Sequence, residues 1–260
     1  TTFFEMESPS AIRSFLATVF YEPIYNLFVG LLTVIPGHSL GWAIVIITLV
    51  IRLILLVPQH HMLTSQKKLQ VIQPKIKALQ TKYKDDQAKL GMEMLELYKK
   101  EGVNPMGSCL PLLIQMPILI GLYWVISGIN DPSNFYHLYN FFTTFDPNRI
   151  DTRFFGIELH QIGGIMGGIF AVILAFIQWI QAKLSFSYNP PPAKKEATNA
   201  EITPAEAMLD PNMMKNMMLY MFPIMIGVSA FFFPLGVGLY WFIGTLFVIG
   251  QQAYVNRSKK

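Results

Sequence analysis

Four apolar runs in this sequence are long enough, or nearly long enough, to cross the hydrocarbon core of a membrane as helices. A core of roughly 30 Å needs about 20 predominantly apolar residues in a helix. The runs cover residues 40–57, 110–129, 162–180 and 217–254. Only 14% of the 260 residues are charged, against about 25% in an average soluble domain, so little polar surface remains to coat a soluble core. The chain is therefore expected to be an integral membrane protein.

The last of these runs is too long for a single helix. Its residues 233–236, FPLG, contain a proline and a glycine, which favour a turn between two spans. The expected spans are residues 40–58, 106–129, 161–183, 213–233 and 234–254. Nine lysines lie between the first two spans, whereas only Arg149 and Arg153 lie between the second and third. Because lysine and arginine accumulate on the cytoplasmic side, we predict an N-terminus outside and a C-terminus in the cytoplasm.

The segments outside the spans differ in composition. Residues 1–39 are expected to be extracytoplasmic, and their apolar residues recur at helical spacing, which favours an amphipathic interfacial helix over a sixth span. Pro23 is expected to begin or kink that helix. The remaining expectations are an aromatic extracytoplasmic loop at 130–160, a flexible cytoplasmic loop at 184–212 and a short basic cytoplasmic tail at 255–260.

Residues 59–105 form a charged segment with two helical patterns. Apolar residues repeat every three or four positions at 69–79 and again at 94–98, which predicts a cytoplasmic hairpin of two amphipathic helices. Two roles fit such a hairpin: docking of a partner, or a solvated surface that faces lipid headgroups. The residues assigned to partner docking are Lys67, Lys68, Lys75, Lys77, Asp85 and Asp86.

The sequence carries no recognisable catalytic or metal-binding motif. The phosphate-binding pattern GxxxxGK[ST], the zinc motif HExxH and the nucleophile motif GxSxG do not occur. The single cysteine, Cys109, cannot form an internal disulfide, and the adjacent His60 and His61 diverge on a helix. We therefore expect no enzymatic activity, no cofactor, no metal and no direct binding of nucleic acid.

Arg52 interrupts the first apolar run. A charged side chain at the centre of a membrane helix costs roughly 2.5–3.5 kcal/mol on insertion scales, so the structure has to compensate for it. The side chain could snorkel to the membrane surface near Pro58, or several helices could enclose a wet cavity in which Arg52 is the fixed charge. Gln115 and Gln178 lie in other spans, where interhelical hydrogen bonding is the simpler role. Six methionines between residues 213 and 225 fit either core filling or an adaptable apolar surface.

Several stretches of this chain together resemble the pattern of YidC-type membrane protein insertases, bacterial relatives of mitochondrial and chloroplast insertases. The most specific is VNPMGSCLPLLIQMPILIGLY at residues 103–123. Weaker ones follow the same order along the chain: QPKI at 73–76, FFGIEL at 154–159, FIQ at 176–178 and FPLGVGLYW at 233–241. The first-span arginine that precedes a proline is a further similarity. The resemblance extends from about residue 22 to residue 252.

The resemblance implies an all-α integral membrane protein with five transmembrane helices around a hydrophilic groove. It also implies an insertase of the bacterial inner membrane that needs no ATP, with a groove open to the cytoplasm and to lipid. The implied groove residues are Arg52, Gln178 and Trp241, with Gln115 as a further polar candidate. The implied face along which the substrate slides is formed by Pro111, Met116, Pro117 and Tyr240.

Implied partners are nascent membrane proteins and the lipid bilayer, with the ribosome, a signal-recognition targeting system and a Sec-type translocation channel as further candidates. We expect neither the large domain that precedes the core in some family members nor a long basic tail. From the residues alone, two other classes stay open: a small-anion transporter or channel in which Arg52 binds the anion, and a scaffold for other membrane complexes. The paired broken helices of many transporters do not stand out in this sequence.

Overall fold

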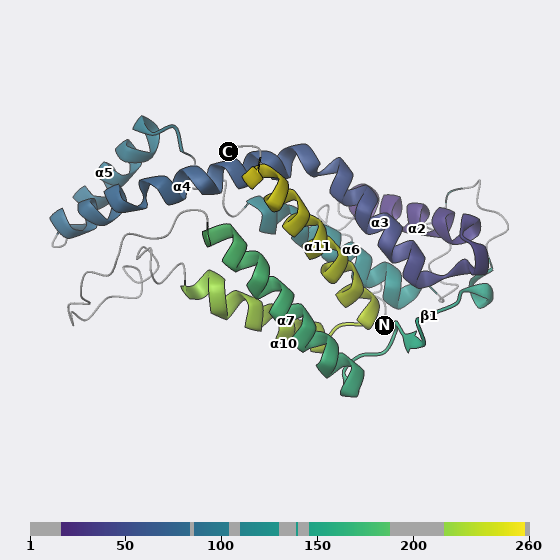
Figure 1. Ribbon diagram of the computed structural model, residues 1–260. Helices are drawn as coiled ribbons and strands as arrows, with labels where there is room; N and C mark the ends of the chain where they lie inside the picture. Colours follow the sequence, from purple (N-terminus) through teal and green to yellow (C-terminus); the bar gives the residue numbers. More distant parts are fainter. Residues whose placement is uncertain are drawn as a thin grey trace, which may run out of the picture. The chain divides into compact units, whose positions relative to one another are not determined.

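A computed structural model describes residues 17–83, 86–103, 110–129, 139, 146–187 and 216–257. These residues are mostly helical, with one short antiparallel hairpin (Figure 1). The helices are the π-helical turn η2 (Ala17–Tyr21), α2 (Glu22–Val34), η3 (Pro36–His38), α3 (Leu40–Ile54), α4 (Leu56–Lys82), α5 (Gln87–Lys100), α6 (Leu110–Gly128), η6 (Pro147–Arg149), α7 (Gly164–Ser187), η7 (Met217–Met221), α10 (Phe222–Phe231) and α11 (Leu235–Arg257). The strands are β1 (Arg153–Phe154) and β2 (Ile157–Glu158).

The chain divides into two compact units. The first comprises residues 1–51, 113–171 and 229–243, and the second comprises residues 52–112, 172–228 and 244–260, within the described ranges. Most of the expected aromatic loop and flexible loop, together with Asp85, lie outside the described residues.

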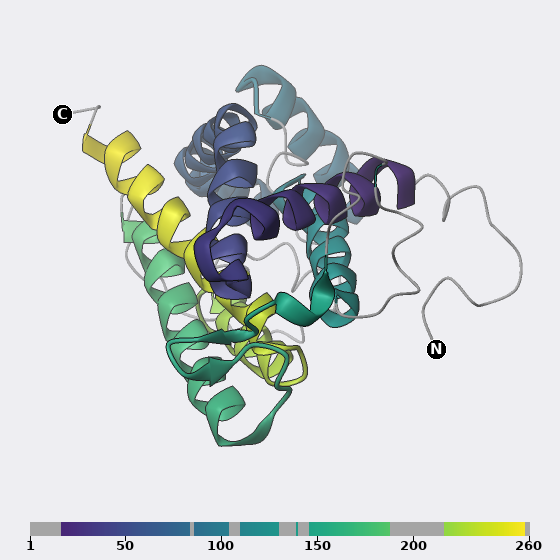
Figure 2. The same cartoon turned by 90° about the vertical axis from the view of Figure 1, so that its right-hand side faces the viewer.

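In the first unit, α2 is an amphipathic helix with a well-defined start. Glu22 and Pro23 occupy its first turn, where a carboxylate favours the helix dipole and proline loses no hydrogen bond. Tyr25, Phe28, Val29 and Leu32, at helical spacing, are all fully buried. In Figure 2, α2 runs across the direction of the following helix α3. The helix therefore contributes a buried face to the core of this unit.

Two further contacts hold α2 in place. The rings of Tyr21 and Trp124 meet edge to face with centroids 6.2 Å apart, so the start of α2 packs on α6. On α2 itself, the buried side-chain oxygen of Asn26 accepts a hydrogen bond of 2.6 Å from the backbone N–H of Tyr139. A polar side chain inside an apolar core is thus satisfied by the segment that follows α6.

The segment around the β1–β2 hairpin accepts hydrogen bonds from the first N–H groups of two helices in the first unit, α3 and α11. The backbone N–H of Leu40 at the start of α3 donates to the carbonyl of Asp151 over 2.9 Å. At the start of α11, Leu235 and Gly236 donate to the carbonyls of Gln161 and Leu159 over 3.0 and 2.8 Å. The first N–H groups of a helix have no partner within the helix, so these bonds replace the missing acceptors. α11 also begins directly after Pro234, at the turn expected from the sequence.

In the second unit, α4 and α5 pack against each other around their own small core. Its buried members are Ile72, Ile76, Leu90, Met94 and Val103. Asp86 caps α5 by accepting the N–H of Lys89 over 3.0 Å. Because these side chains form one buried cluster, the α4–α5 hairpin has a packing core of its own.

α5 ends in a glycine-dependent cap. Gly102 has a φ of 60°, and its N–H donates to the carbonyl of Lys99, while the N–H of Val103 donates to the carbonyl of Tyr98. These two bonds form a Schellman motif, in which the left-handed position favours glycine. The motif turns the chain back so that the side chain of Val103 joins the hairpin core.

Two helices of the described chain are long and apolar enough to cross a membrane: residues Gly164–Ser185 of α7 and Leu235–Tyr254 of α11. Helices α2, α3, α6 and α10 are shorter apolar elements. On α7, Val172 is 69% exposed and Phe176 is 60% exposed. A contiguous apolar surface of this kind is unusual on a soluble monomer and is typical of a membrane or a binding interface.

The methionines of η7 and α10 do not fill the core. Met217, Met218, Met221 and Met225 are exposed, whereas core filling would have buried them. That interpretation is therefore wrong for these four residues, and an apolar surface is the alternative that fits. The other two methionines of the set, Met213 and Met214, lie outside the described residues.

Candidate functional site

Arg52 lies in the last turn of α3 and is buried. Only 6% of its surface is exposed, so the guanidinium is enclosed by protein rather than extended to the molecular surface. The helix α3 is continuous up to Ile54 and α4 starts at Leu56, so the break between the two helices lies at Leu55. Simple snorkelling predicts an exposed tip, and the burial of Arg52 therefore disagrees with it.

Helix α11 provides the surface against which Arg52 lies. A Cβ atom placed on Gly244 would be only 2.5 Å from Nη2 of Arg52, closer than real Cβ atoms come to such a neighbour. The absence of a side chain at Gly244 therefore makes room for the guanidinium. The next residue, Thr245, is buried and donates a long hydrogen bond of 3.4 Å to the side-chain oxygen of Gln178 on α7.

Two helical turns further along, α7 and α11 make a second polar pair. The side-chain amide of Gln252 donates to the hydroxyl of Ser185 over 2.7 Å. Thr245 and Gln252 are seven residues apart on α11, as are Gln178 and Ser185 on α7. A seven-residue spacing returns to nearly the same face after two turns, so the two pairs lie along one seam of parallel helices. We call these four residues the polar seam.

The polar seam and Arg52 concentrate buried polarity around the second half of α11. Arg52, Gln178, Thr245 and Gln252 are all buried, and Gln251 donates to the carbonyl of Leu56 over 3.3 Å. Polar groups inside an apolar helix bundle cost free energy unless they are hydrogen-bonded, and a guanidinium costs the most. Such a concentration is typical of a functional site in a membrane protein.

Gln115 and Tyr240 of the first unit form a direct pair. The side-chain amide of Gln115 donates to the Tyr240 hydroxyl over 2.9 Å. Tyr240 is fully buried, so it contributes no exposed surface to the expected sliding face and instead supports Gln115. Of the other residues expected on the sliding face, Met116 is 43% exposed and Pro117 is half-buried, while the side chain of Pro111 lies outside the described residues. Trp241, which was expected in the groove, is half-buried on α11.

The residues assigned to partner docking differ in their surroundings on the α4–α5 hairpin. Lys75 pairs with Glu101 over 2.6 Å at the surface, and Asp86 is occupied as the cap of α5. Lys68 is exposed and Lys77 is half-buried. The side chain of Lys67 lies outside the described residues, as does Asp85. Lys75 and Asp86 thus have structural roles within the hairpin.

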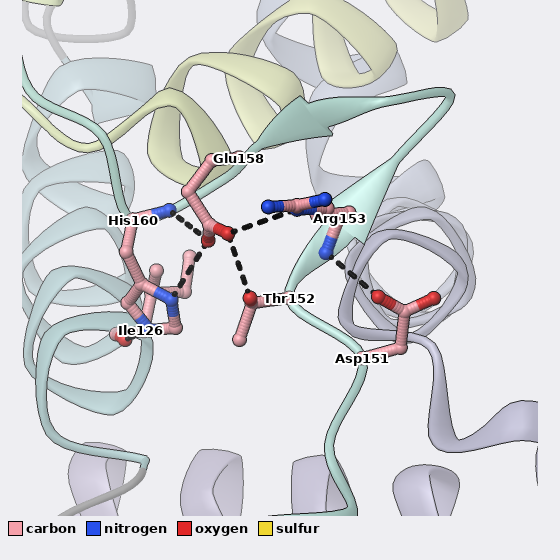
Figure 3. Close-up of polar contacts among 6 residues, drawn as sticks. All are labelled: Ile126, Asp151, Thr152, Arg153, Glu158 and His160. Atoms are coloured by element: carbon pink, nitrogen blue, oxygen red, sulfur yellow. Dashed lines mark hydrogen bonds and ion pairs between the residues drawn. The ribbon is translucent and has the colours of Figure 1, made fainter.

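A second polar cluster surrounds Glu158 at the end of the β1–β2 hairpin (Figure 3). Its carboxylate accepts hydrogen bonds from the Thr152 hydroxyl over 3.0 Å and from the backbone N–H of His160 over 3.4 Å. It also lies 3.9 Å from Nε of Arg153. Nε2 of His160 in turn lies 2.7 Å from the carbonyl of Ile126, near the end of α6. The cluster ties the hairpin to a helix end, which is a structural role.

The surroundings of Glu158 favour its ionised form. Burial of the carboxyl by itself raises the pKa, but hydrogen bonds from Thr152 and His160, together with the charge of His160, lower the pKa of Glu158 below its ordinary value. Within the described ranges, no group of three or more histidine, cysteine, aspartate or glutamate residues could hold a metal ion. The cluster therefore has the properties of a clamp rather than of a metal site.

Sequence comparison identifies the family of this chain. A family model described as 60Kd inner membrane protein matches residues 31–260. The chain belongs to this family of YidC-type insertases. The family is one of inner membrane proteins, which agrees with the apolar surface of α7.

Several curated relatives carry the name membrane protein insertase YidC. The protein of Oceanobacillus iheyensis is 34% identical over 244 residues, which cover 92% of this chain and 83% of the relative. The protein of Methylobacillus flagellatus is 30% identical over 241 residues, or 93% of this chain and 36% of the relative. That of Neisseria gonorrhoeae is 31% identical over 239 residues, with 92% and 36% covered. The chain thus spans about a third of the length of the latter two relatives.

The sequence analysis missed four members of the site in this YidC-type chain: Ser185, Gly244, Thr245 and Gln252. The seven-residue spacing of Thr245 and Gln252 within an apolar helix was a signal, because Gln178 and Ser185 repeat it on α7. Gly244 carried no comparable signal, since other glycines occur in the same helix. Only its position against Arg52 distinguishes it.

Proposed function

We propose that this chain is a membrane protein insertase in which Arg52 receives the hydrophilic tail of a newly made membrane protein. The observation that carries the proposal is the buried guanidinium of Arg52, 6% exposed, against Gly244 of an apolar helix whose next residue, Thr245, is buried and bonded to Gln178. Membership of the insertase family supports the substrate class.

Such a site is needed because moving a hydrophilic protein tail through the hydrocarbon of the membrane costs free energy. A polar or charged group that enters hydrocarbon without a partner loses several kcal/mol of solvation. A polar recess that reaches into the membrane from the cytoplasm shortens the dry path for the tail. Within it, Arg52 attracts a carboxylate by charge-assisted hydrogen bonding, which is roughly twice as strong as the neutral kind. No nucleotide hydrolysis is needed for this step.

Release is driven by the substrate and the membrane. Burial of the arriving apolar helix in lipid is favourable at about 25 cal/mol per Å². In the predicted orientation, the N-terminus lies outside and the C-terminus in the cytoplasm, and the proposed recess is open to the cytoplasm. A negative tail then moves outward with the membrane potential, which contributes about 2.3 kcal/mol per charge per 100 mV. The attraction of Arg52 therefore has to be transient.

Other parts of the chain have separate roles in the proposed function. Met116 and Pro117 form an apolar face along which the substrate slides, supported by the Gln115–Tyr240 pair. Gln115 and Trp241, both in the first unit, stay polar positions implied by the family resemblance, and substitution of each tests its role. The α4–α5 hairpin meets the nascent chain, the ribosome, a targeting factor or a translocation channel, with exposed Lys68 as one contact.

Reconstitution in liposomes tests the central claim. The purified chain should insert a small single-span client without ATP. Arg52→Glu should impair a client with an acidic tail most, whereas Arg52→Lys should retain most of the activity because it keeps the charge. Arg149→Glu, which makes the same charge change at an exposed position, serves as the control. Wild-type insertion by Arg52→Glu would refute the charge-capture step, and anion flux without insertion would support a transporter instead.

Photo-crosslinking tests the sliding face. A photoreactive residue at exposed Met116 should capture nascent membrane proteins during insertion. The same probe at buried Ile118, two residues along α6, is the matched control. Adducts with lipid alone at Met116 would remove the face from the proposed function.

A further inference from the structure

The contact between Gly244 and Arg52 involves the charged group itself. A Cβ atom at Gly244 would lie 2.5 Å from Nη2, 3.0 Å from Nε and 3.1 Å from Cζ of Arg52. The three nearest atoms therefore all belong to the guanidinium. The guanidinium therefore could not keep its present position if residue 244 carried a methyl group.

Other glycines of α11 have different surroundings. A Cβ at Gly236 would meet aliphatic carbons, at 3.0 Å on Ile44 and 3.2 Å on Ile126, a close approach of the kind that small residues allow between packed helices. At Gly250, nothing lies within 4 Å of the added atom. Gly244 thus differs from both in facing a charge rather than apolar carbons or open space.

Helix stability does not explain a glycine at position 244. Alanine is a better helix former than glycine in the interior of a helix, because glycine loses more backbone entropy on folding. α11 continues without a break from Leu235 to Arg257, so no turn or cap requires glycine in its middle. The remaining explanation within the described residues is the space that Arg52 occupies.

We propose that Gly244 is a positioning residue that seats the guanidinium of Arg52 against α11 and thereby sets the preference of the insertase for acidic tails. This inference rests on the proposed capture of tails by Arg52. A side chain at position 244 displaces the far end of a flexible arginine rather than the backbone. The fold is then preserved, and what changes is the place where the positive charge is presented.

Tail-charge selectivity provides the test in the full chain. The measured quantity is the ratio of insertion of a client with an acidic tail to that of the same client with its tail carboxylates replaced by amides. Gly244→Ala should lower this ratio about twofold or more, within the range of coupling between residues in contact. Gly250→Ala, the matched substitution on the same helix with open space around it, should leave the ratio unchanged.

The Arg52→Lys background should remove the effect of Gly244→Ala, which would not happen if Gly244 were needed only for helix packing. Lysine has no atom equivalent to Nη2, the atom nearest the added methyl group, and it keeps the charge. In an Arg52→Lys background, Gly244→Ala should therefore leave the ratio unchanged and the double variant should fold with normal yield. An equal loss of selectivity or yield in both backgrounds overturns the inference. So does a Gly244→Ala ratio equal to that of wild type.

A chemical readout separates the inference from the proposed function. Labelling of Arg52 by phenylglyoxal, followed by mass spectrometry of the purified protein, reports the surroundings of the guanidinium without any client. Labelling should be faster in Gly244→Ala than in wild type and Gly250→Ala, and equal rates overturn the seating. If Arg52→Glu inserts both clients normally while labelling still changes, the proposed function fails and only the seating of the guanidinium stands.

Discussion

Ile76 is predicted to hold the α4–α5 hairpin together. It is 5% exposed and packs in the cluster with Ile72, Leu90, Met94 and Val103. The substitution Ile76→Ala removes three carbon atoms from this site. At about 0.8 kcal/mol per buried CH₂ group, the lost burial amounts to about 2.4 kcal/mol. The cavity left behind adds to the loss, which brings it into the usual range of about 2–5 kcal/mol.

Hydrogen exchange measures this loss directly. Local opening of a packed element exposes its amides, so a loss of about 2.4 kcal/mol corresponds to roughly 50-fold faster exchange. Mass spectrometry of the full chain in detergent should show the increase in peptides from α5, residues 87–100. Exchange in the interior of α7 should stay unchanged, because the described residues that pack in and against this cluster belong to α4, α5 and their flanking turns.

Val71→Ala is the matched control for Ile76→Ala. Val71 lies on the same helix but is 63% exposed, so its truncation removes little buried surface. Both substitutions also gain helix propensity of less than about 0.7 kcal/mol, which slightly opposes any loss. Similar exchange of α5 in the two variants would refute a hairpin core, and so would rapid exchange of α5 in the wild type.

Three further predictions concern single polar groups. Asp86→Ala removes the cap of α5 and should cost about 1 kcal/mol, seen as roughly fivefold faster exchange in the first turn of α5. Tyr240→Phe removes the partner of Gln115 and should lower stability by about 0.5–1.5 kcal/mol in thermal unfolding, with no further loss when Gln115→Leu is added. The pKa of Glu158 is lowered from its ordinary value of 4.5, so its stabilising contribution is complete above that pH and is lost as the pH falls through the lower folded value. Melting temperatures measured from pH 7 to pH 3 should therefore fall less in Glu158→Gln than in the wild type; equal slopes would contradict the clamp.

The elements of this chain follow from local patterns in the sequence. Pro23 marks the start of α2, and the Pro234 turn separates α10 from α11, because proline acts on the backbone of its immediate neighbours. The helical repeat of Ile72, Ile76 and Met94 likewise identified much of the hairpin core. These features depend on neighbours a few residues away, which the sequence shows directly.

The partners of the site depend on how distant helices are rotated, which local patterns do not specify. Gln178 could be identified as a polar residue in a span, but its pairing with Thr245, 67 residues away, needs the structure. Tyr240 was expected on a substrate face. In the structure it is fully buried, and its hydroxyl accepts a hydrogen bond from Gln115. The family pattern does not show this contact, because it depends on how α6 and α11 are rotated. Val103 joined the hairpin core only because the Gly102 cap turns the chain back.

The two pairs of the polar seam differ in a way that bears on the proposed function. Gln252 and Ser185 are 2.7 Å apart, a short and strong hydrogen bond, whereas Thr245 and Gln178 are 3.4 Å apart, near the limit of a hydrogen bond. The seam is therefore tighter away from Arg52 and looser at Thr245, directly after the glycine against which the guanidinium lies. On the proposed function, an arriving carboxylate would meet the Thr245 hydroxyl directly after the glycine that faces Arg52, while the bond between Gln252 and Ser185 keeps α7 and α11 in register.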